Sequence, residues 1–362
     1  MAGLRPLLMP FLFAAALVSA EAQTKVVGVL TPLSGRHENL GKQLLEGAKA
    51  AIATHNLANP GNRVQLEFRD SKCEVDAALK EEAALRKAGA EILVGPMCNR
   101  PLIALLDRKA SEILPTLVAF QRDKRLEDGR KKNGWPIYTL EPEAKAEPQA
   151  IVKFLLNRWS ETPYAILDDG SVYGRGLADD IQGLAEARGQ SPVALANFRP
   201  LQTSQAHVLR RLAKSGIKAI YVAGDAEDVS VFAKDAIRLG LELEVAGGEP
   251  LALLPFIDGL EQVPEGILAI LQTQAVSLPK AEALIDRMAK AKIKVDGAFL
   301  RGMALTQIAI GTLNGGKVEL SGKYDTVLGS IEFKQDGRAD ILPLELFVWR
   351  NGKFEPQSQL TQ

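Results

Sequence analysis

Short runs of aliphatic residues alternate with longer segments of helical periodicity, and this alternation limits the folds open to the chain. Val26–Leu30, Val64–Asp70 and Ile92–Val94 have the composition of strands, whereas Lys42–His55 and Val75–Ala88 between them have the periodicity of helices. Strands that are joined through helices, with no tight-hairpin signal between them, form a parallel sheet that is covered by helices on both faces. The sequence therefore predicts an α/β fold.

The same alternation begins again after a proline-rich crossing at 141–148. The strands expected there are Tyr164–Leu167, Val193–Phe198, Ala219–Val222, Glu244–Ala246 and Ile267–Gln272. The helices expected there are Gly174–Arg188, Ser204–Ser215, Asp228–Leu239, Lys280–Lys290 and Ala298–Asn314. A chain of 362 residues exceeds the usual size of one hydrophobic core. We therefore expect two doubly wound, Rossmann-like lobes, with short strands in the tail at 324–349.

The amino terminus resembles a secretory signal. Arg5 precedes an unbroken apolar run, Pro6–Val18, and the following Ser19–Ala22 offers small residues at the spacing that a signal peptidase accepts. We expect residues 1–22 to be a cleaved signal peptide. The run is too short to span a bilayer comfortably, so no direct membrane insertion is expected after cleavage.

The chain has two cysteines, Cys73 and Cys98, and the expected compartment decides between their possible roles. Thiols oxidise outside the cytoplasm, so a disulfide is the default expectation. A zinc site would need about four ligands, and the three histidines do not stand at metal-binding spacing. A thiol nucleophile would need a neighbouring general base, which the sequence does not show. No metal or cofactor is predicted.

Charge and motif searches favour binding over catalysis. The 44 basic and 44 acidic residues balance, which argues against a nucleic-acid partner. The sequence has no Gly-x-Ser-x-Gly elbow, phosphate-binding loop or His-Glu-x-x-His helix. The acidic pair Asp168–Asp169 could serve acid-base chemistry, so a secreted hydrolase of sugars or esters stays an alternative.

Several loops follow the expected strands, where ligands of such sheets bind. These loops are 31–35, 95–99, 119–122, 168–174, 223–225 and 247–250. Two lobes that carry such loops can form a cleft that closes on a small molecule.

These segments carry a resemblance to a known family. VVGVLTPLSGRHENLGKQLLEGAKAAIATHN (26–56), D-x-x-C at Asp70–Cys73 with G-P-x-C at Gly95–Cys98, DDGSVYGRGLADDI (168–181) and AIYVAGDAEDVSVFAKDAIRLGL followed by VAGGEP (219–250) occur in this order. The chain resembles periplasmic solute-binding proteins of ABC importers, of the branched-chain amino acid (Leu/Ile/Val-binding) type. The resemblance covers nearly the whole mature chain, and in that family the matching cysteines form a disulfide.

The resemblance implies a type I periplasmic binding fold, with a ligand cleft between two lobes that are joined by three crossings. Lobe one would contain 25–140 plus 273–340, and lobe two 141–272 plus 341–362. The protein would capture a small polar solute in the periplasm as a monomer and deliver it to membrane permease subunits of an ABC importer. A binding protein that serves a sensor or an oxidation pathway is a variant of the same interpretation.

Some ligand-binding residues follow from the same resemblance. Glu249 matches the glutamate that holds an amino acid's ammonium group, and Tyr173 matches a tyrosine of the cleft. Ser34 lies in the first of the loops. Glu249 could instead be a solvated loop residue, and Tyr173 could pack at the start of a helix.

Other positions depart from the family pattern. Asn99 stands where relatives place a hydroxyl, and Phe120 and Arg122 stand near the position of a threonine. Asp225 replaces a second tyrosine of the cleft. Arg122 or Arg100 could clamp a carboxylate, or either could be a surface arginine. With Asp225 opposite an arginine, the solute could be more polar or more cationic than leucine.

Overall fold

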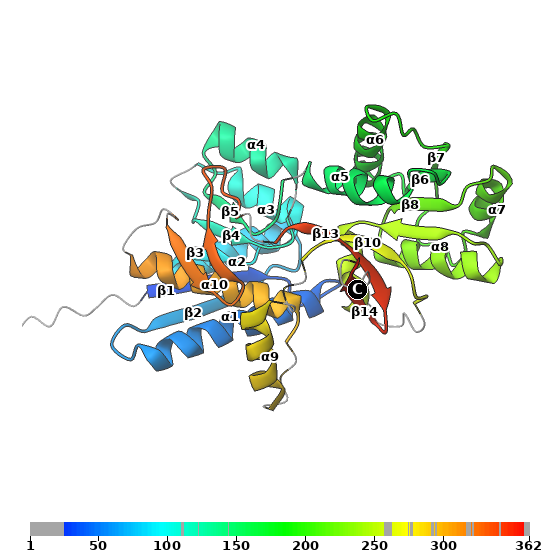
Figure 1. Ribbon diagram of the computed structural model, residues 1–362. Coiled ribbons are helices and arrows are strands. Elements are labelled where there is room, and N and C mark those ends of the chain that lie inside the picture. Colours follow the sequence, from blue (N-terminus) through cyan, green and yellow to red (C-terminus); the bar gives the residue numbers. More distant parts are fainter. Residues whose placement is uncertain are drawn as a thin grey trace, which may run out of the picture.

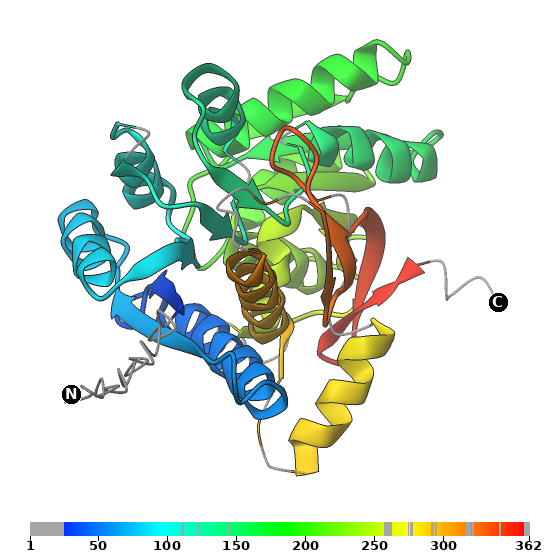
Figure 2. The same ribbon diagram turned by 90° about the vertical axis from the view of Figure 1, so that its left-hand side faces the viewer.

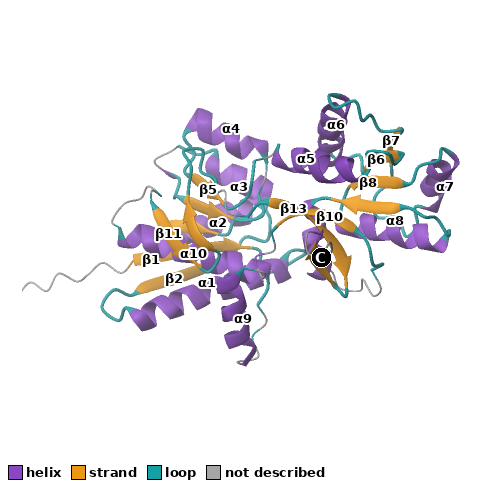
Figure 3. Ribbon diagram, in the orientation of Figure 1, coloured by secondary structure: helices purple, strands orange, loops and turns teal. Residues whose placement is uncertain are grey.

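The computed structural model describes residues 25–357 except for some short gaps. The residues left out within this range are 110, 111, 122, 144, 257–262, 274, 276, 277, 291, 292, 294, 316–319, 321, 340 and 341. The predicted signal peptide therefore lies outside the described residues. Figure 1 shows two lobes side by side, and Figure 3 shows that each has strands at its centre and helices around them.

A five-stranded sheet forms the centre of lobe one, and all of its strand pairs are parallel. The strands are β1 (Lys25–Thr31), β2 (Val64–Asp70), β3 (Ala90–Val94), β4 (Thr116–Val118) and β5 (Ile137–Thr139). Their order is β2-β1-β3-β4-β5, so the chain reverses its direction of winding at β1 and β3. A ligand crevice is expected beyond the carboxyl ends of the strands at such a reversal.

Helices bury both faces of this sheet. On one face, Val27 and Val29 of β1 join a core with α1 (Glu38–Ala58) and α10 (Gly297–Asn314), which Figure 2 shows side by side. On the other face, Val26 and Leu30 of the same strand pack with residues of α2 (Val75–Lys87) and α3 (Asn99–Leu106). Because side chains alternate between the two faces of a strand and helices cover both faces, every residue from Val26 to Leu30 of β1 is nonpolar.

The remaining elements of lobe one complete this arrangement. They are α4 (Lys124–Asn133), α9 (Pro279–Lys290) and the antiparallel pair β11 (Lys323–Thr326) and β12 (Gly329–Glu332). Residues of α9, β11 and β12 contribute to the core that α1 and α10 share. Lobe one is therefore assembled from segments that lie far apart in the sequence.

A seven-stranded sheet forms the centre of lobe two, in the order β14-β13-β10-β9-β8-β6-β7. Its parallel part contains β6 (Tyr164–Asp168), β7 (Ala194–Asn197), β8 (Ala219–Ala223), β9 (Glu244–Gly247) and β10 (Leu268–Gln272). β13 (Leu344–Arg350) and β14 (Lys353–Pro356) extend it in antiparallel fashion.

Helices cover both faces of this second sheet as well. α7 (Ala206–Lys214) and α8 (Ala226–Arg238) pack on one face. α5 (Ala146–Ile151), its π-helical continuation at Val152–Leu156, and α6 (Val172–Glu186) pack on the other. A 3₁₀ segment, Glu249–Phe256, follows β9. The two doubly wound lobes confirm the predicted fold class.

Three elements differ from the sequence prediction. α4 was not expected, because its sequence KRLEDGRKKN has almost no apolar periodicity; Asp123, which caps its first turn, and the left-handed Gly134 delimit it instead. β5 was not expected either, because its three residues are too few to show a strand pattern. The proline-rich crossing at 141–148 is partly helical, because Pro148 falls in the first turn of α5, where a missing N–H costs nothing.

Glycines bring α1 and α10 into backbone contact. A Cβ on Gly47 would lie 1.9 Å from the carbonyl oxygen of Phe299, and a Cβ on Gly302 would lie 2.1 Å from that of Leu44. Neither position has room for a side chain, so this close crossing requires glycine on both helices.

We predict that Gly47→Ala and Gly302→Ala each lower the free energy of unfolding by about 1–3 kcal/mol, because the added methyl group forces the helices apart. Gly183→Ala is the matched control: it is helical, and no atom lies within 4 Å of the position that an added methyl group would take. At position 183, alanine should raise the free energy of unfolding by about 0.5–1 kcal/mol, because alanine favours the helix more than glycine does. Urea denaturation measures both effects, and equal values at positions 47 and 183 would contradict the packing argument.

Candidate ligand-binding site

The carboxyl-terminal edges of the two parallel sheets face each other. Arg36 and His37 follow β1 in lobe one, and Asp225 follows β8 in lobe two. Loss of hydration raises the pKa of Asp225, Glu227 and Asp169 raise it further, and Arg36 and His37 lower it across the gap between the lobes. Burial lowers the pKa of His37, Arg36 lowers it further, and Asp225 raises it. A direct contact also joins the two edges: the Gln272 side chain, at the end of β10, donates to the carbonyl oxygen of Leu140, which follows β5, at 3.1 Å.

Ser34 is held in the turn after β1. Its hydroxyl donates to the Asp70 carboxylate at 2.6 Å, and the Leu33 N–H donates to the same carboxylate at 2.8 Å. Burial raises the pKa of Asp70, but the hydrogen bonds from Ser34, Leu33 and Lys72 bring it below its usual value. Asp70, at the end of β2, therefore fixes the orientation of Ser34.

The disulfide between Cys73 and Cys98 confirms the pairing that the sequence favoured, with the two Cα atoms 5.5 Å apart. It connects the loop after β2 to the amino terminus of α3, which begins at Asn99. The side chains of Asn99 and Arg100 are exposed. The bridge thus holds the start of α3 at the sheet edge, where the first N–H groups of a helix favour an anion.

Phe120 has a strained backbone at the end of β4. Its φ of 65° is rare for an aromatic residue, and its N–H donates to Glu141 Oε1 at 3.0 Å. The Arg301 guanidinium lies 4.8 Å from the centre of the Phe120 ring. The next residue, Gln121, is buried and donates to the Met97 carbonyl oxygen. Arg122 lies outside the described residues.

Gln272, at the carboxyl end of β10, connects several crossings between the lobes. Its side-chain amide donates to the carbonyl oxygens of Leu140 at 3.1 Å and Leu342 at 3.3 Å, and its amide oxygen accepts from Arg301 Nη2 at 2.9 Å. The side chain is 2 % exposed. The chain passes between the lobes near Leu140, near Gln272 itself and near Leu342, so one buried amide holds the three crossings together.

Glu249 and Tyr173 lie in one hydrogen-bonded group of lobe two. The Glu249 carboxylate accepts from the Gln272 N–H, and the Glu249 N–H donates to Glu147 Oε1 at 3.1 Å. The Tyr173 hydroxyl donates to Glu147 Oε2 at 2.9 Å, while the residue as a whole stays 47 % exposed. The structure thus brings these two predicted residues together through Glu147, which the sequence prediction missed.

Tyr221 lies beneath this group, inside the apolar run of β8. Burial raises the pKa of Tyr221 well above its usual value, and the charges of Glu147 and Glu249 raise it further. Its hydroxyl has no hydrogen-bond partner among the described residues. The tyrosine in the apolar run AIYVA was the one sequence signal for this residue. Glu147 lies in the proline-rich crossing and Arg301 in a predicted helix, and neither position has a distinguishing pattern.

Asp168 and Asp169 serve the turn that begins α6. Asp168 Oδ1 accepts from the Gly170 N–H, and Asp169 Oδ1 accepts from the Ser171 N–H, both at 2.9 Å. Each carboxylate thus stabilises its own turn, as short acidic side chains in loops commonly do.

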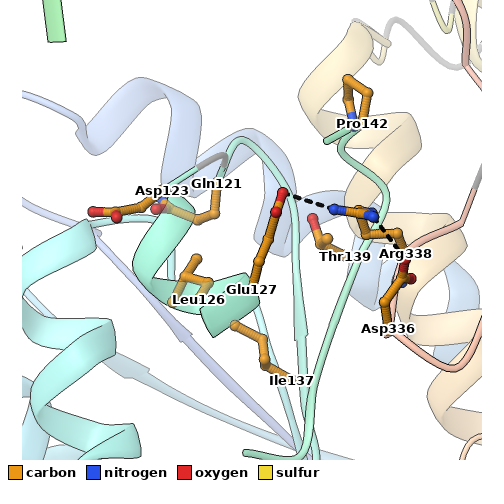
Figure 4. A pocket seen from close by; sticks show the side chains of 10 residues that line it. Gln121, Asp123, Leu126, Glu127, Ile137, Thr139, Pro142, Asp336 and Arg338 are labelled. Carbon is orange, nitrogen blue, oxygen red and sulfur yellow. Dashed lines mark hydrogen bonds and ion pairs between the residues drawn. The ribbon is translucent and has the colours of Figure 1, made fainter. Parts of the chain in front are cut away.

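A small, partly open pocket lies near the first crossing and is too small for a solute. Figure 4 shows it between α4, β5 and the turn at 336–338, where Arg338 contacts Glu127 at 2.7 Å and Asp336 at 2.6 Å. Its volume of about 20 Å³ suits about one water molecule. The ion pairs there brace the end of β5 within lobe one.

Among the residues that the structure describes, no group of three or more histidine, cysteine, aspartate or glutamate side chains is arranged to hold a metal ion. No helix in this part of the chain is long and apolar enough to cross a membrane.

The comparisons with known proteins agree with this architecture. A family model described as a periplasmic binding protein matches residues 25–318. The chain belongs to this family. Membership confirms the resemblance seen in the sequence, and it confirms the prediction of a binding protein over an enzyme.

Individual relatives are distant but match over almost the full length. A leucine-, isoleucine-, valine-, threonine- and alanine-binding protein of Pseudomonas aeruginosa is 24 % identical, with 91 % of each chain covered. The Leu/Ile/Val-binding protein of Escherichia coli is 22 % identical, with 91 % of this chain and 92 % of the relative covered.

Solved structures show the same fold. A substrate-binding protein of an ABC transporter from Desulfitobacterium hafniense, in complex with Leu, matches with a TM-score of 0.75 at 17 % identity, covering 92 % of this chain and 100 % of the other. A solute-binding protein of Rhodopseudomonas palustris, in complex with p-hydroxybenzoic acid, matches with a TM-score of 0.74 at 16 % identity, covering 92 % and 95 %.

The acidic group around α8 gives a test of the local electrostatics. Burial raises the pKa of Asp228 to about 6; the Leu201 N–H lowers it, and Asp225, Asp169 and Glu227 raise it. The folded protein therefore holds this proton more tightly than the unfolded chain does. Ionisation of Asp228 lowers the free energy of unfolding. This loss is absent below about pH 4 and complete above about pH 6.

We predict that Asp228→Asn raises the free energy of unfolding by on the order of 1–3 kcal/mol at pH 7.5 and that this gain vanishes near pH 4. The amide oxygen can still accept from the Leu201 N–H. Asp180→Asn, at an exposed position of α6, is the control and should give little change at either pH. Urea denaturation at both pH values tests this, and a gain that does not depend on pH would contradict the assignment.

Proposed function

We propose that this chain is the extracytoplasmic solute-binding component of an ABC importer, which captures a small amino acid or a related carboxylate or amide between its lobes. Lobe one comprises 25–140 plus 273–340, and lobe two 141–272 plus 341–362. After removal of residues 1–22 the protein acts in the periplasm as a monomer, and it delivers the solute to membrane permease subunits.

The observation that carries this proposal is the opposite character of the two facing edges. Lobe two presents the carboxylate of Glu249, with Glu147 behind it and the Tyr173 ring beside it. Lobe one presents the amino terminus of α3 at Asn99 and, in the loop after β1, Arg36. The Ser34 hydroxyl donates its proton to Asp70, so it is left to accept a hydrogen bond from the solute. An ammonium group is stabilised by the first edge and a carboxylate by the second. A zwitterionic solute therefore satisfies both lobes at once.

Closure of the lobes follows from this arrangement. A solute that contacts both edges binds the closed form more tightly than the open form, and this difference in affinity shifts the population towards closure. Gln272 and the crossings that it holds form the hinge in this proposal. In this proposal the backbone of the three crossings changes conformation on closure, while the ligand-binding loops of each lobe keep their conformation.

The relatives support two solute classes. The Pseudomonas and Escherichia coli proteins are both named for binding leucine, isoleucine and valine, and the Rhodopseudomonas structure holds an aromatic acid without an amine. Phe120 and Asp225 differ from the family pattern that the sequence suggests, and Phe120 provides an aromatic wall. We favour the amine-bearing solute, because Glu249 and Glu147 place two carboxylates at one edge.

The test is a thermal-shift screen of the mature protein after unfolding and refolding to strip bound solute. The panel contains amino acids, amides, small carboxylates, aromatic acids and sugars. A ligand at about 100 times its dissociation constant adds roughly 2.7 kcal/mol of stability. A shift with amino acids supports the proposal; a shift only with acids that lack an amine, or with sugars, contradicts the amine assignment.

We predict that Glu249→Gln weakens binding of an amino-acid ligand found in this screen by at least about tenfold, because it removes the charge opposite the ammonium group. Glu242→Gln makes the same chemical change at an exposed position near the opposite end of β9 and should leave affinity unchanged. Calorimetric titration of both variants measures this. Equal affinities in Glu249→Gln and the unmodified protein would refute the role of Glu249.

A further inference from the structure

Glu147 is a buried carboxylate in the first turn of α5, with 4 % of its surface exposed. Both of its oxygens accept hydrogen bonds from other elements of lobe two. Oε2 accepts from the Tyr173 hydroxyl at the start of α6, and Oε1 accepts from the Glu249 N–H at the start of the segment after β9. A buried charge persists only where such donors stabilise it. These donors belong to the two residues of lobe two that the family resemblance places in the cleft.

The backbone beside Glu249 is shaped to admit this carboxylate. A Cβ on Gly248 would lie 2.2 Å from Glu147 Oε1 and 2.6 Å from the Tyr221 hydroxyl. Only a residue without a side chain leaves room for the carboxylate to reach the Glu249 N–H. The glycine, the buried acid and the two cleft residues therefore form one interlocked unit.

This unit extends to the hinge. The Glu249 carboxylate accepts from the Gln272 N–H, so the position of Glu249 is fixed from one side by Glu147 and from the other by the end of β10. Without the hydrogen bond to Glu147, the Glu249 carboxylate would still accept from Gln272, but the backbone of Glu249 would be free to rotate. The direction of its carboxylate relative to the cleft depends on both contacts.

We infer that Glu147 is a positioning residue of the ligand site, which sets the orientation of Glu249 and Tyr173 and so determines selectivity for solutes with an amine. This inference rests on the proposed function, in which Glu249 meets the ammonium group. Glu147 itself acts through these two residues. Its removal therefore affects an amine-bearing solute far more than the same solute without its amine.

The test compares two matched probes, L-leucine and 4-methylpentanoate, which differ by the amine. Calorimetry should show that Glu147→Ala weakens L-leucine binding by at least about tenfold and 4-methylpentanoate binding by less than about threefold. Glu147→Gln should recover most of the loss, because its amide oxygen accepts from the Glu249 N–H and its NH₂ donates to the Tyr173 oxygen. Glu161→Ala, at an exposed loop position, is the control and should match the unmodified protein.

A second measurement does not depend on the solute. Hydrogen exchange of the Glu249 amide should be at least about tenfold faster in Glu147→Ala than in Glu161→Ala, with the amides of β6 and β8 unchanged. If the unmodified protein binds neither probe, the proposed function fails for these solutes. The exchange rate of the Glu249 amide then tests by itself whether Glu147 positions Glu249. Unchanged exchange at Glu249, or equal loss of affinity for both probes, would overturn the assignment of Glu147.

Discussion

The side-chain amide of Gln272 is the contact on which the two-lobed arrangement depends. The side-chain amide donates to the backbone carbonyls of Leu140 and Leu342 and accepts from Arg301. The backbone N–H of Gln272 donates to the Glu249 carboxylate. Each bond joins segments that are distant in the sequence, and the side chain is almost fully buried. Removal of one partner would leave the others buried without hydrogen bonds, which costs more than the bond itself contributes. A glutamine is suited to this position, because it is uncharged and both donates and accepts.

The facing edges can be polar because the sheets behind them are apolar on both faces. The loops that follow the parallel strands lie at one edge of each sheet, and helices cover the faces of both sheets. Within lobe one, Asp70 and the Cys73–Cys98 disulfide fix the turn at Ser34 and the start of α3. Within lobe two, Glu147 fixes Tyr173 and Glu249. Each edge is therefore rigid, and the freedom to move is concentrated in the crossings around Gln272.

The sequence was sufficient to predict the fold but only part of the site. Strands such as β1 and β8 were predictable because burial on both faces makes most of their residues apolar, and α1 because its apolar residues repeat at helical spacing. α4 escaped prediction because its stability depends on caps and on charged side chains around one buried leucine. Glu147, Arg301 and Gln272 escaped because their roles come from contacts across long stretches of chain, and no local pattern distinguishes them from surface residues. The positions of Glu249 and Tyr173 came from resemblance, and their roles as ligand contacts stay predictions.

The most direct test of the central claim, that a small solute binds between the lobes and closes them about Gln272, is small-angle X-ray scattering of the mature protein. The measurement compares the stripped protein with the protein saturated by the ligand that the thermal screen identifies. The account predicts a smaller radius of gyration on binding, because solute contacts from both lobes favour the closed form. An unchanged radius of gyration at a ligand concentration that calorimetry shows to be saturating would contradict it, since the solute would then bind without drawing the lobes together.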